Sequence, residues 1–198
     1  MATLFYQGHG SLRITTTEGK VIYVDPYIGE GYDLQADAIL VSHQHGDHNQ
    51  LDLIKSRSAE CVIITEAQAI KDSEHQTIDL GYVKVEAVEA GNKNHDPAQC
   101  VGFILTLSDG VQVYLSCDTA KTAQMSTFAD RKIDYAFFCC DGVYNMDRKE
   151  ASECAELVKA KHSIPYHMAP GELFNREIAE EFTADGRLII AAGEEITL

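Results

Sequence analysis

Three histidines and one aspartate fall within six consecutive positions, in the segment Ser-His-Gln-His-Gly-Asp-His at 42–48. The segment follows the apolar run 38–41, which is typical of a buried strand, so the cluster should stand at one rim of a sheet. Imidazole nitrogen and carboxylate oxygen are the ligand types that catalytic zinc and related ions take. Surface loops and expression tags also collect histidines, but this cluster is mid-chain and has an aspartate at a fixed offset. The spacing therefore indicates a metal site.

Four further potential ligands each lie just past another apolar run: Asp25, His95, Asp118 and His167. If the corresponding strands share one orientation, their ends meet at one edge, where open sheets carry binding sites. Taken singly, each residue has an ordinary structural explanation as a turn residue, a loop residue, a helix cap or a satisfied core histidine. Together with the cluster, they supply about the inventory that a two-metal site needs.

Composition limits the class of protein. A chain of 198 residues with 45% apolar and 24% charged residues suits a single domain over residues 1–198. No apolar run approaches the roughly 20 residues of a membrane span, and no signal peptide is evident, so we expect a cytoplasmic protein without membrane partners. A net charge of −15 argues against nucleic acid as a partner, because such binding depends on cationic contacts.

The six cysteines include no Cys-x-x-Cys pair, and several lie in apolar runs. Free, buried thiols in a reducing compartment are therefore expected, in preference to disulfides or a thiolate metal site.

Periodicity predicts strands mixed with helices. Strands are expected within 4–16 (as strand, turn, strand) and at 21–24, 38–42, 61–65, 81–88, 101–107, 111–115, 133–140, 163–166 and, as a pair, 187–198. Helices are expected after a cap at Asn49 and at 66–71, 121–129, 147–161 and 175–182. The helix at 147–161 has Asp147 as its cap, Glu150 in capping-box position and an apolar face formed by Ala151, Cys154, Ala155 and Val158. This order of elements predicts two sheets packed on each other with helices outside.

The cluster His43-x-His45-x-Asp47-His48, with Asp25 before it and His95, Asp118 and His167 after it, resembles the metallo-β-lactamase fold superfamily. Further motifs resemble its L-ascorbate-6-phosphate lactonase-like branch: Gly8-His9-Gly10-Ser11, Val24-Asp25-Pro26, Asn94-His95, Cys117-Asp118-Thr119, the segment 141–146 and Ile164-Pro165-Tyr166-His167. The resemblance covers essentially the whole chain. It implies an α/β (α+β) fold, a four-layer αββα sandwich with the site at one edge between the sheets.

The resemblance also implies roles for the candidate ligands. His43, His45 and His95 resemble the ligands of a first metal, Asp47, His48 and His167 those of a second, and Asp118 the carboxylate that bridges both. Asp25 resembles an aspartate that orients a ligand histidine. The alternative to His95 is His75, whose polar surroundings indicate an exposed turn. Cys117 stands where the family usually has glycine, and we expect it to pack in the core.

This ligand set predicts a metal-dependent hydrolase. In this hypothesis a hydroxide that bridges two metals attacks a small ester, lactone or phosphoester, and Asp47 or Asp118 moves the proton. His9 and either Tyr144 or Asn145 are expected to line the mouth and meet the substrate, unless they are turn residues without a chemical role. Zinc suits these ligands, and the carboxylate oxygens among them are also compatible with manganese or iron. The alternatives are a di-iron redox protein and a non-catalytic metal-binding protein on the same fold. The natural substrate and the oligomeric state stay open.

Overall fold

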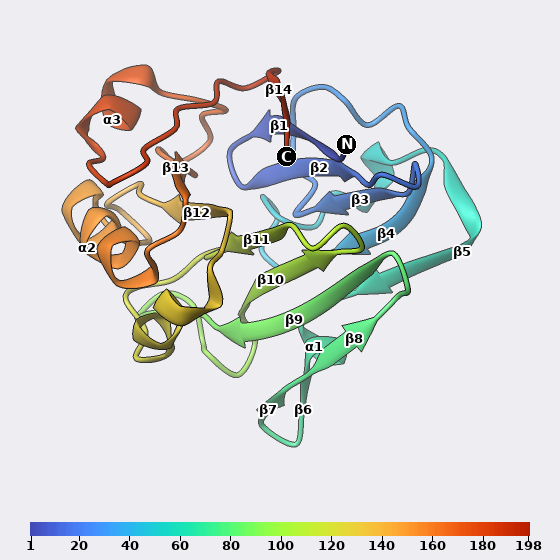
Figure 1. Cartoon of the computed structure of the whole chain (residues 1–198), viewed down its shortest axis with the longest axis horizontal. Coiled ribbons are helices and arrows are strands. Elements are labelled where there is room, and N and C mark those ends of the chain that lie inside the picture. The colour runs from blue at the N-terminus through green and yellow to red at the C-terminus, as the bar shows by residue number, and fades with distance from the viewer.

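The computed structural model describes residues 1–198 as two stacked sheets with a few helices at their margins (Figure 1). The strands are β1 (Thr3–Gly8), β2 (Ser11–Thr15), β3 (Val21–Val24), β4 (Ala36–Leu40), β5 (Arg57–Ile64), β6 (Ile70–Lys71), β7 (Glu74–His75), β8 (Thr77–Asp79), β9 (Val83–Glu89), β10 (Val101–Leu107), β11 (Gln112–Leu115), β12 (Tyr135–Cys139), β13 (His162–Tyr166) and β14 (Glu195–Thr197). The helices are α1 (Glu66–Ala69), α2 (Arg148–Val158) and α3 (Arg176–Glu181), with 3-10 turns η1 (Leu51–Leu53), η2 (Gln124–Thr127) and η3 (Ala129–Arg131). None of the helices combines the length and apolarity that a membrane crossing requires.

Strand direction decides where the polar residues after each strand emerge. The first sheet has the order β14-β1-β2-β3-β4-β5 and the second β13-β12-β11-β10-β9-β8. Strands β3, β4 and β5 are parallel, and β1 runs in the same direction because β2 is antiparallel to both β1 and β3. By the same pairing logic β9, β11, β12 and β13 share one direction in the second sheet. Residues that follow these strands therefore leave each sheet at a common edge.

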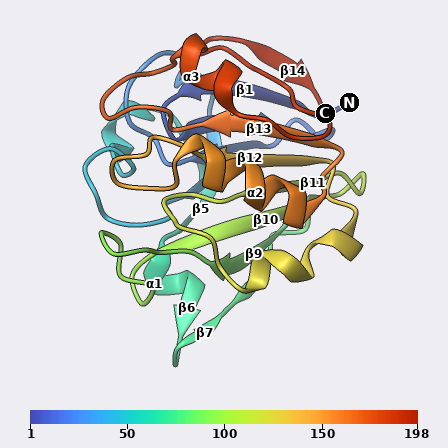
Figure 2. The same cartoon turned by 90° about the vertical axis from the view of Figure 1, so that its left-hand side faces the viewer.

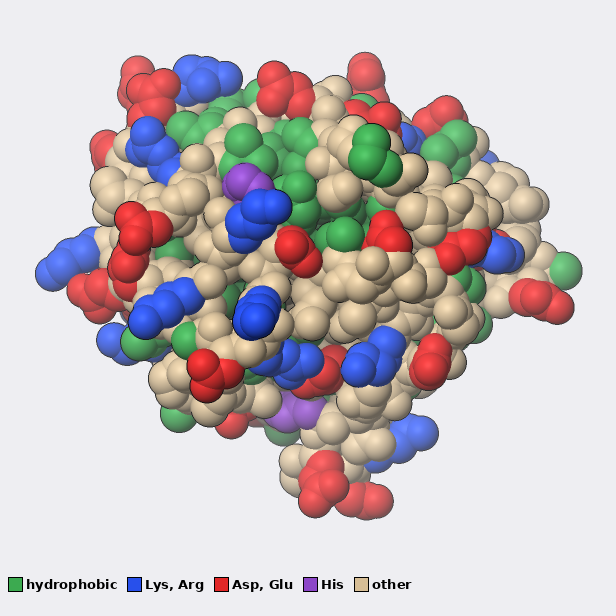
Figure 3. Space-filling view, viewed as in Figure 1, with side chains coloured by type: hydrophobic (Ala, Val, Ile, Leu, Met, Phe, Trp, Pro, Cys, Tyr) green, Lys and Arg blue, Asp and Glu red, His purple; other side chains and the backbone are tan.

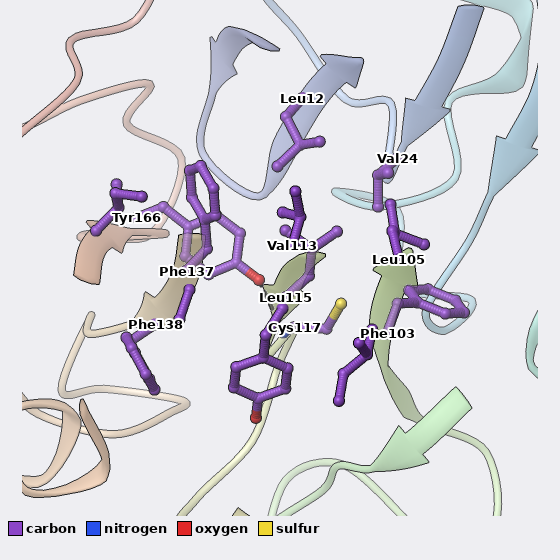
Figure 4. Close-up of a cluster of buried hydrophobic side chains, with 14 of the residues drawn as sticks. Leu12, Val24, Phe103, Leu105, Val113, Leu115, Cys117, Phe137, Phe138 and Tyr166 are labelled. Atoms are coloured by element: carbon purple, nitrogen blue, oxygen red, sulfur yellow. Dashed lines mark hydrogen bonds between the residues drawn. The ribbon is translucent and has the colours of Figure 1, made fainter. Parts of the chain in front are cut away.

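The main core fills the space between the two sheets. Figure 4 shows Leu12 and Val24 of the first sheet opposite Val113 and Leu115 of the second, within one cluster of 44 buried residues. The alternation in β3 explains the layering, because Val24 faces this core while Tyr23 faces outward into a smaller apolar cluster. Each large side chain buried there contributes about 1.5–3 kcal/mol.

Helices cover the outer faces unequally. Helix α2 lies against the second sheet (Figure 2), and its buried residues include the four predicted for its apolar face: Ala151, Cys154, Ala155 and Val158. No long helix covers the outer face of the first sheet. The smaller apolar cluster there is completed by Tyr32, from a loop, and by Ile54, which ends η1. The expected αββα sandwich is confirmed, with a thin outer layer on this side.

Four local expectations were wrong, and tertiary contacts explain why. The helix expected at 121–129 is two 3-10 turns, because the backbone and side chain of Gln124 bond with Glu89 of β9. Helix α1 ends at Ala69, since the next residues pair as the β6–β7 hairpin. Asn49 does not cap η1, because its amide bonds to Gln44 instead. Only β14 forms within 187–198, beyond a turn at Gly193.

The cap of α2 is confirmed in part. The Asp147 side chain accepts the backbone N–H of Glu150, as expected. The reciprocal half of a capping box is absent, because the Glu150 carboxylate accepts the N–H of Lys121 instead. All six cysteines are free, and five of them are buried, as the sequence indicated. Cys117 belongs to the main core, where Figure 4 draws its sulfur among apolar side chains.

Candidate metal centre

The candidate ligands lie where strands end. His9 follows β1, Asp25 follows β3, the segment 43–48 follows β4, and His167 follows β13. His9, Asp25 and His167 have positive φ angles of 55°, 45° and 46°, a conformation that non-glycine residues rarely adopt. The chain therefore turns sharply as it leaves each strand, which brings these side chains to the edge between the two sheets. Such strain persists only where the surrounding fold holds it, and it often marks a functional site.

Two groups of donor atoms that share no residue form at this edge, and a third group, of His43, His48 and Asp118, links them. His43, His45 and His95 place their nitrogens within 4.8 Å of one another. A second group consists of Asp47, His48, His167 and also His9. These are the two sets that the resemblance implied, with His9 added to the second.

Asp118 lies between the two groups. Its Oδ2 is 3.2 Å from Nε2 of His95, while its Oδ1 is 3.4 Å from Nε2 of both His48 and His167. Asp118 and these three histidines are all at most 5% exposed. The carboxylate thus reaches one histidine of the first group and two of the second.

Several of these buried atoms have no hydrogen-bond partner. They are His43 Nε2, His48 Nε2, His167 Nε2 and Asp118 Oδ1. A buried polar atom without a partner costs about 1–3 kcal/mol, so a fold rarely retains several of them side by side. Imidazole nitrogens and a carboxylate oxygen aimed at a shared space are a donor set that fits divalent cations.

Asp25 holds the histidines of the cluster from behind. Its Oδ1 accepts the backbone N–H of Ser42 at 2.7 Å, and its Oδ2 lies 2.7 Å from Ser42 Oγ and 3.0 Å from His48 Nδ1. The Ser42 hydroxyl is in turn 2.9 Å from Nδ1 of His43. With Ser42 donating to Asp25, both histidines carry a proton on Nδ1, so Nε2 is the nitrogen of each ring that faces the site.

Asp141 is a buried carboxylate behind the second group. Its Oδ1 accepts the N–H groups of Val143, Tyr144 and Asn145, and its Oδ2 lies 3.3 Å from Nδ1 of His167. Although burial opposes ionisation, the contact with His167 and these N–H groups lower the pKa of Asp141 to about 2. A fixed negative charge therefore stands behind His167.

Charge within the centre is balanced between acids and histidines. Burial, and then the neighbouring His48, lower the pKa of His43 to about 3, so its ring is neutral. Burial also disfavours charge on His48, but Asp118 and Asp25 outweigh it and raise the pKa of His48 to about 9. The pKa of Asp118 falls well below its usual range because His167 and His48 outweigh its burial. A cation that binds here competes with a proton on His48.

The remaining predicted residues divide between the mouth and the interior. Tyr144 is 53% exposed and lines a cavity of about 230 Å³ at the two groups. His9 is fully buried, so it does not line the mouth; its Nε2 lies 3.2 Å from Asp47 and its ring 3.8 Å from that of His167. Asn145 is half-buried, and its amide donates to Asp118 at 2.9 Å. His75 lies in β7 beside a different cavity, outside both groups.

Two supporting residues were missed from the sequence. Asp141 follows the predicted strand 133–140, so the strand-end rule that selected Asp25 and Asp118 could have selected it too. Asn92 accepts from His95 Nδ1 at 3.0 Å, and no sequence signal distinguishes it from an ordinary loop residue. A surface hollow of about 1010 Å³ beside α2 contains none of the donor residues.

Comparison with known proteins agrees with this geometry. A family model described as a beta-lactamase superfamily domain matches residues 3–167. The chain belongs to the β-lactamase superfamily. Within it, the chain belongs with the UPF0173 metal-dependent hydrolases: a member from Geobacillus sp. (strain WCH70) is 30% identical over 82% of this chain and 83% of its own. The likeness to the lactonase-like branch stays a prediction.

Solved structures give the same architecture. A protein of Parabacteroides distasonis, assigned as a metal-dependent hydrolase, matches with a TM-score of 0.79 at 29% identity, over 96% of this chain and 92% of that one. CmlA, a diiron beta-hydroxylase from Streptomyces venezuelae, matches with a TM-score of 0.73 at 14% identity, over 100% of this chain and 54% of CmlA. The second likeness is one of fold alone.

Proposed function

We propose that this member of the superfamily hydrolyses a small, uncharged ester or lactone with two divalent cations. His43, His45 and His95 would hold the first cation, Asp47, His48 and His167 the second, and Asp118 both. The observation that carries the proposal is the convergence of four buried donor atoms that lack a partner, on His43, His48, His167 and Asp118. Cations bound there would supply a water made acidic enough to attack near neutral pH, and would polarise the substrate oxygen.

The chain's own residues orient this chemistry. Asp118 spans the two groups, so its carboxylate fixes their separation. Asp47 is the acid at the opening, since 37% of its side chain is exposed, whereas only 4% of the Asp118 side chain is. This exposure supports Asp47 as the residue that exchanges a proton with solvent. His9 holds Asp47 in place at 3.2 Å from beneath.

The cavity favours a small and uncharged substrate over a phosphoester. It has about 230 Å³ and is lined by His45, Asp47, Asn94, His95, Asp118, Tyr144, His167, Pro170 and Gly171. No Lys or Arg is among these residues, and the neighbouring Lys93 is outside the lining. A substrate phosphate would therefore depend on the cations alone, beside two carboxylates that repel it, whereas Tyr144 and Pro170 offer surface to an acyl group.

The test pairs metal analysis with turnover. We expect about two equivalents of zinc or manganese per purified chain, and hydrolysis of small lactones and esters in preference to matched phosphoesters. Metal-dependent turnover of phosphoesters alone would overturn the substrate assignment. Purified protein with iron and a reversible colour change would favour the redox alternative, and metal-free protein at physiological zinc would favour a non-catalytic role.

On the face drawn in Figure 3, Lys and Arg side chains are interspersed with Asp and Glu. They do not form the basic stripe that is typical of a nucleic-acid-binding surface.

A further inference from the structure

A chain of side-chain amides lies behind the centre and connects His95 with Asp118. It begins at Asn92, whose Oδ1 accepts the backbone N–H of Asn94 at 2.8 Å. A backbone N–H can only donate, so this contact fixes which end of the Asn92 amide is oxygen. The same oxygen lies 3.0 Å from Nδ1 of His95, which must therefore carry the proton. The lone pair of His95 is left on Nε2, the atom that faces Asp118 at 3.2 Å.

The other end of Asn92 determines the orientation of a second amide. Nδ2 of Asn92 donates to Oδ1 of Asn145 at 3.0 Å. The two hydrogens on Nδ2 of Asn145 then point to two carboxylates, Asp118 at 2.9 Å and Asp141 at 2.8 Å. The reverse orientation would place the amide oxygen against both negative charges, so only one arrangement satisfies every partner.

These bonds restrict Asp118. Its Oδ2 is occupied by Asn145, which leaves Oδ1 as the unpartnered atom between His48 and His167. Asp141 cannot rotate away, because its Oδ1 accepts three backbone N–H groups of the segment 143–145. Asn145 therefore holds Asp118 from a fixed anchor.

We propose that Asn92 and Asn145 are positioning residues of the metal centre, in which Asn92 sets the tautomer of His95 and Asn145 sets the orientation of Asp118. The inference rests on the proposed function for the identity of what binds. Neither amide touches the cavity that would receive substrate, since neither residue is in its lining. Supporting residues of this kind are typically worth 10–100-fold in metal affinity or activity.

The first test needs no metal. Nitrogen-15 NMR of the metal-free protein should show His95 protonated on Nδ1 in the parent. Asn92→Asp keeps an oxygen toward His95 and should keep this tautomer, whereas Asn92→Leu should give a mixture. An unchanged His95 tautomer in Asn92→Leu would overturn the role of Asn92. If the parent binds no metal, the proposed function fails, and this measurement still decides whether the amide controls His95.

The second test measures metal affinity by competition with a chromophoric chelator. Asn145→Leu, and separately Asn92→Leu, should each bind zinc about 10–100-fold more weakly. The double variant should lose less than the product of the two losses, because both residues belong to one network. The matched control is Gln35→Leu, which removes an exposed amide at the start of β4 and should leave zinc affinity unchanged.

Activity separates positioning from bulk stability. A displaced Asp118 should lower kcat at saturating metal with KM little changed, and Asn92→Asp should recover part of the loss seen in Asn92→Leu. Zinc affinity within threefold of the parent in both leucine variants would overturn the proposal. So would a fall in thermal stability that leaves affinity and kcat intact, since that would mark the amides as structural only.

Discussion

Asp25→Asn should impair both metal groups at once, although Asp25 is in neither. Asparagine has almost the same shape and tolerates the positive φ of 45° at this position. The amide oxygen must face the backbone N–H of Ser42, because that group can only donate. The amide nitrogen then faces Ser42 Oγ and Nδ1 of His48, where the carboxylate accepted.

Because a donating amide nitrogen replaces an accepting carboxylate oxygen, the protonated nitrogen changes in two histidines. His48 would have to accept at Nδ1, so its proton moves to Nε2 and its lone pair leaves the site. Ser42 Oγ would accept from the substituted amide and donate to Nδ1 of His43, which reverses that ring as well. If each misplaced proton costs 10–100-fold in metal affinity, the two together cost about 10²–10⁴-fold, or about 3–6 kcal/mol.

Zinc competition against a chelator measures the loss, and nitrogen-15 NMR reports the tautomer of His43 at neutral pH and that of His48 above its pKa of about 9. Ser42→Ala removes the hydroxyl that contacts Nδ1 of His43 and leaves the contact between Asp25 and His48. Its zinc affinity should therefore fall by only about 10–100-fold. The control is Asp37→Asn at the start of β4, where the carboxylate also accepts a backbone N–H, from Val21, and contacts Lys20. It should leave zinc affinity unchanged and cost at most about 1 kcal/mol of stability. Folded Asp25→Asn protein with affinity within threefold of the parent would refute the reasoning.

Three further perturbations test other parts of the molecule. A Cβ on Gly10 would lie 3.0 Å from Cε1 of His48 and 3.5 Å from Cδ2 of His167, so Gly10→Ala should weaken the second metal group and leave one strong zinc equivalent by titration. The bidentate contact with Arg131 lowers the pKa of Glu86 below its ordinary 4.5, so the pair contributes stability above that pH and loses it as the pH falls through the lowered value. Arg131→Met should therefore cost about 0.5–1 kcal/mol in urea unfolding at neutral pH, and a cost that does not shrink below pH 4.5 would contradict this. A thiol reagent should modify only Cys61 in native protein and all six thiols after unfolding; fast reaction of a second thiol would show that the core opens.

Much of the centre could be predicted because the strand-end rule is local in sequence. An apolar run followed by Asp or His identifies both the strand and the residue that leaves it, as at Asp25, Asp118 and His167. Pairing direction, which sequence does not show, then decides whether those ends meet. Here β1, β3 and β4 share a direction in one sheet, as do β9, β11, β12 and β13 in the other.

The features that were missed depend on contacts across the fold. Gln124 forms bonds with Glu89, 35 residues away, and these replace the helix that periodicity predicted. Asn145 was named from the motif 141–146, but its bond to Asn92 joins residues 53 positions apart, and Asn92 occupies no patterned position. His9 is in a glycine-containing turn and was expected at the mouth, yet its backbone N–H donates to the carbonyl of Leu173 and its Nδ1 lies 3.1 Å from the carbonyl of Glu172, so these two residues enclose it. The periodicity of apolar residues indicates which face of one helix or strand is buried. It carries no information about hydrogen bonds between residues far apart in the sequence.

The arrangement of supporting residues explains how the fold can hold a preorganised centre. A buried imidazole has two nitrogens, and a fold that satisfies one of them determines the tautomer of the other. Asp25 does this for His48, Ser42 for His43, and Asn92 for His95. Each bond is on the protein side of the ring and leaves Nε2 on the cavity side, where it is unpartnered in His43 and His48 and lies 3.2 Å from Asp118 Oδ2 in His95. The unpartnered atoms are therefore a consequence of the hydrogen bonds behind them, and a bound cation would recover the free energy that this arrangement leaves unsatisfied.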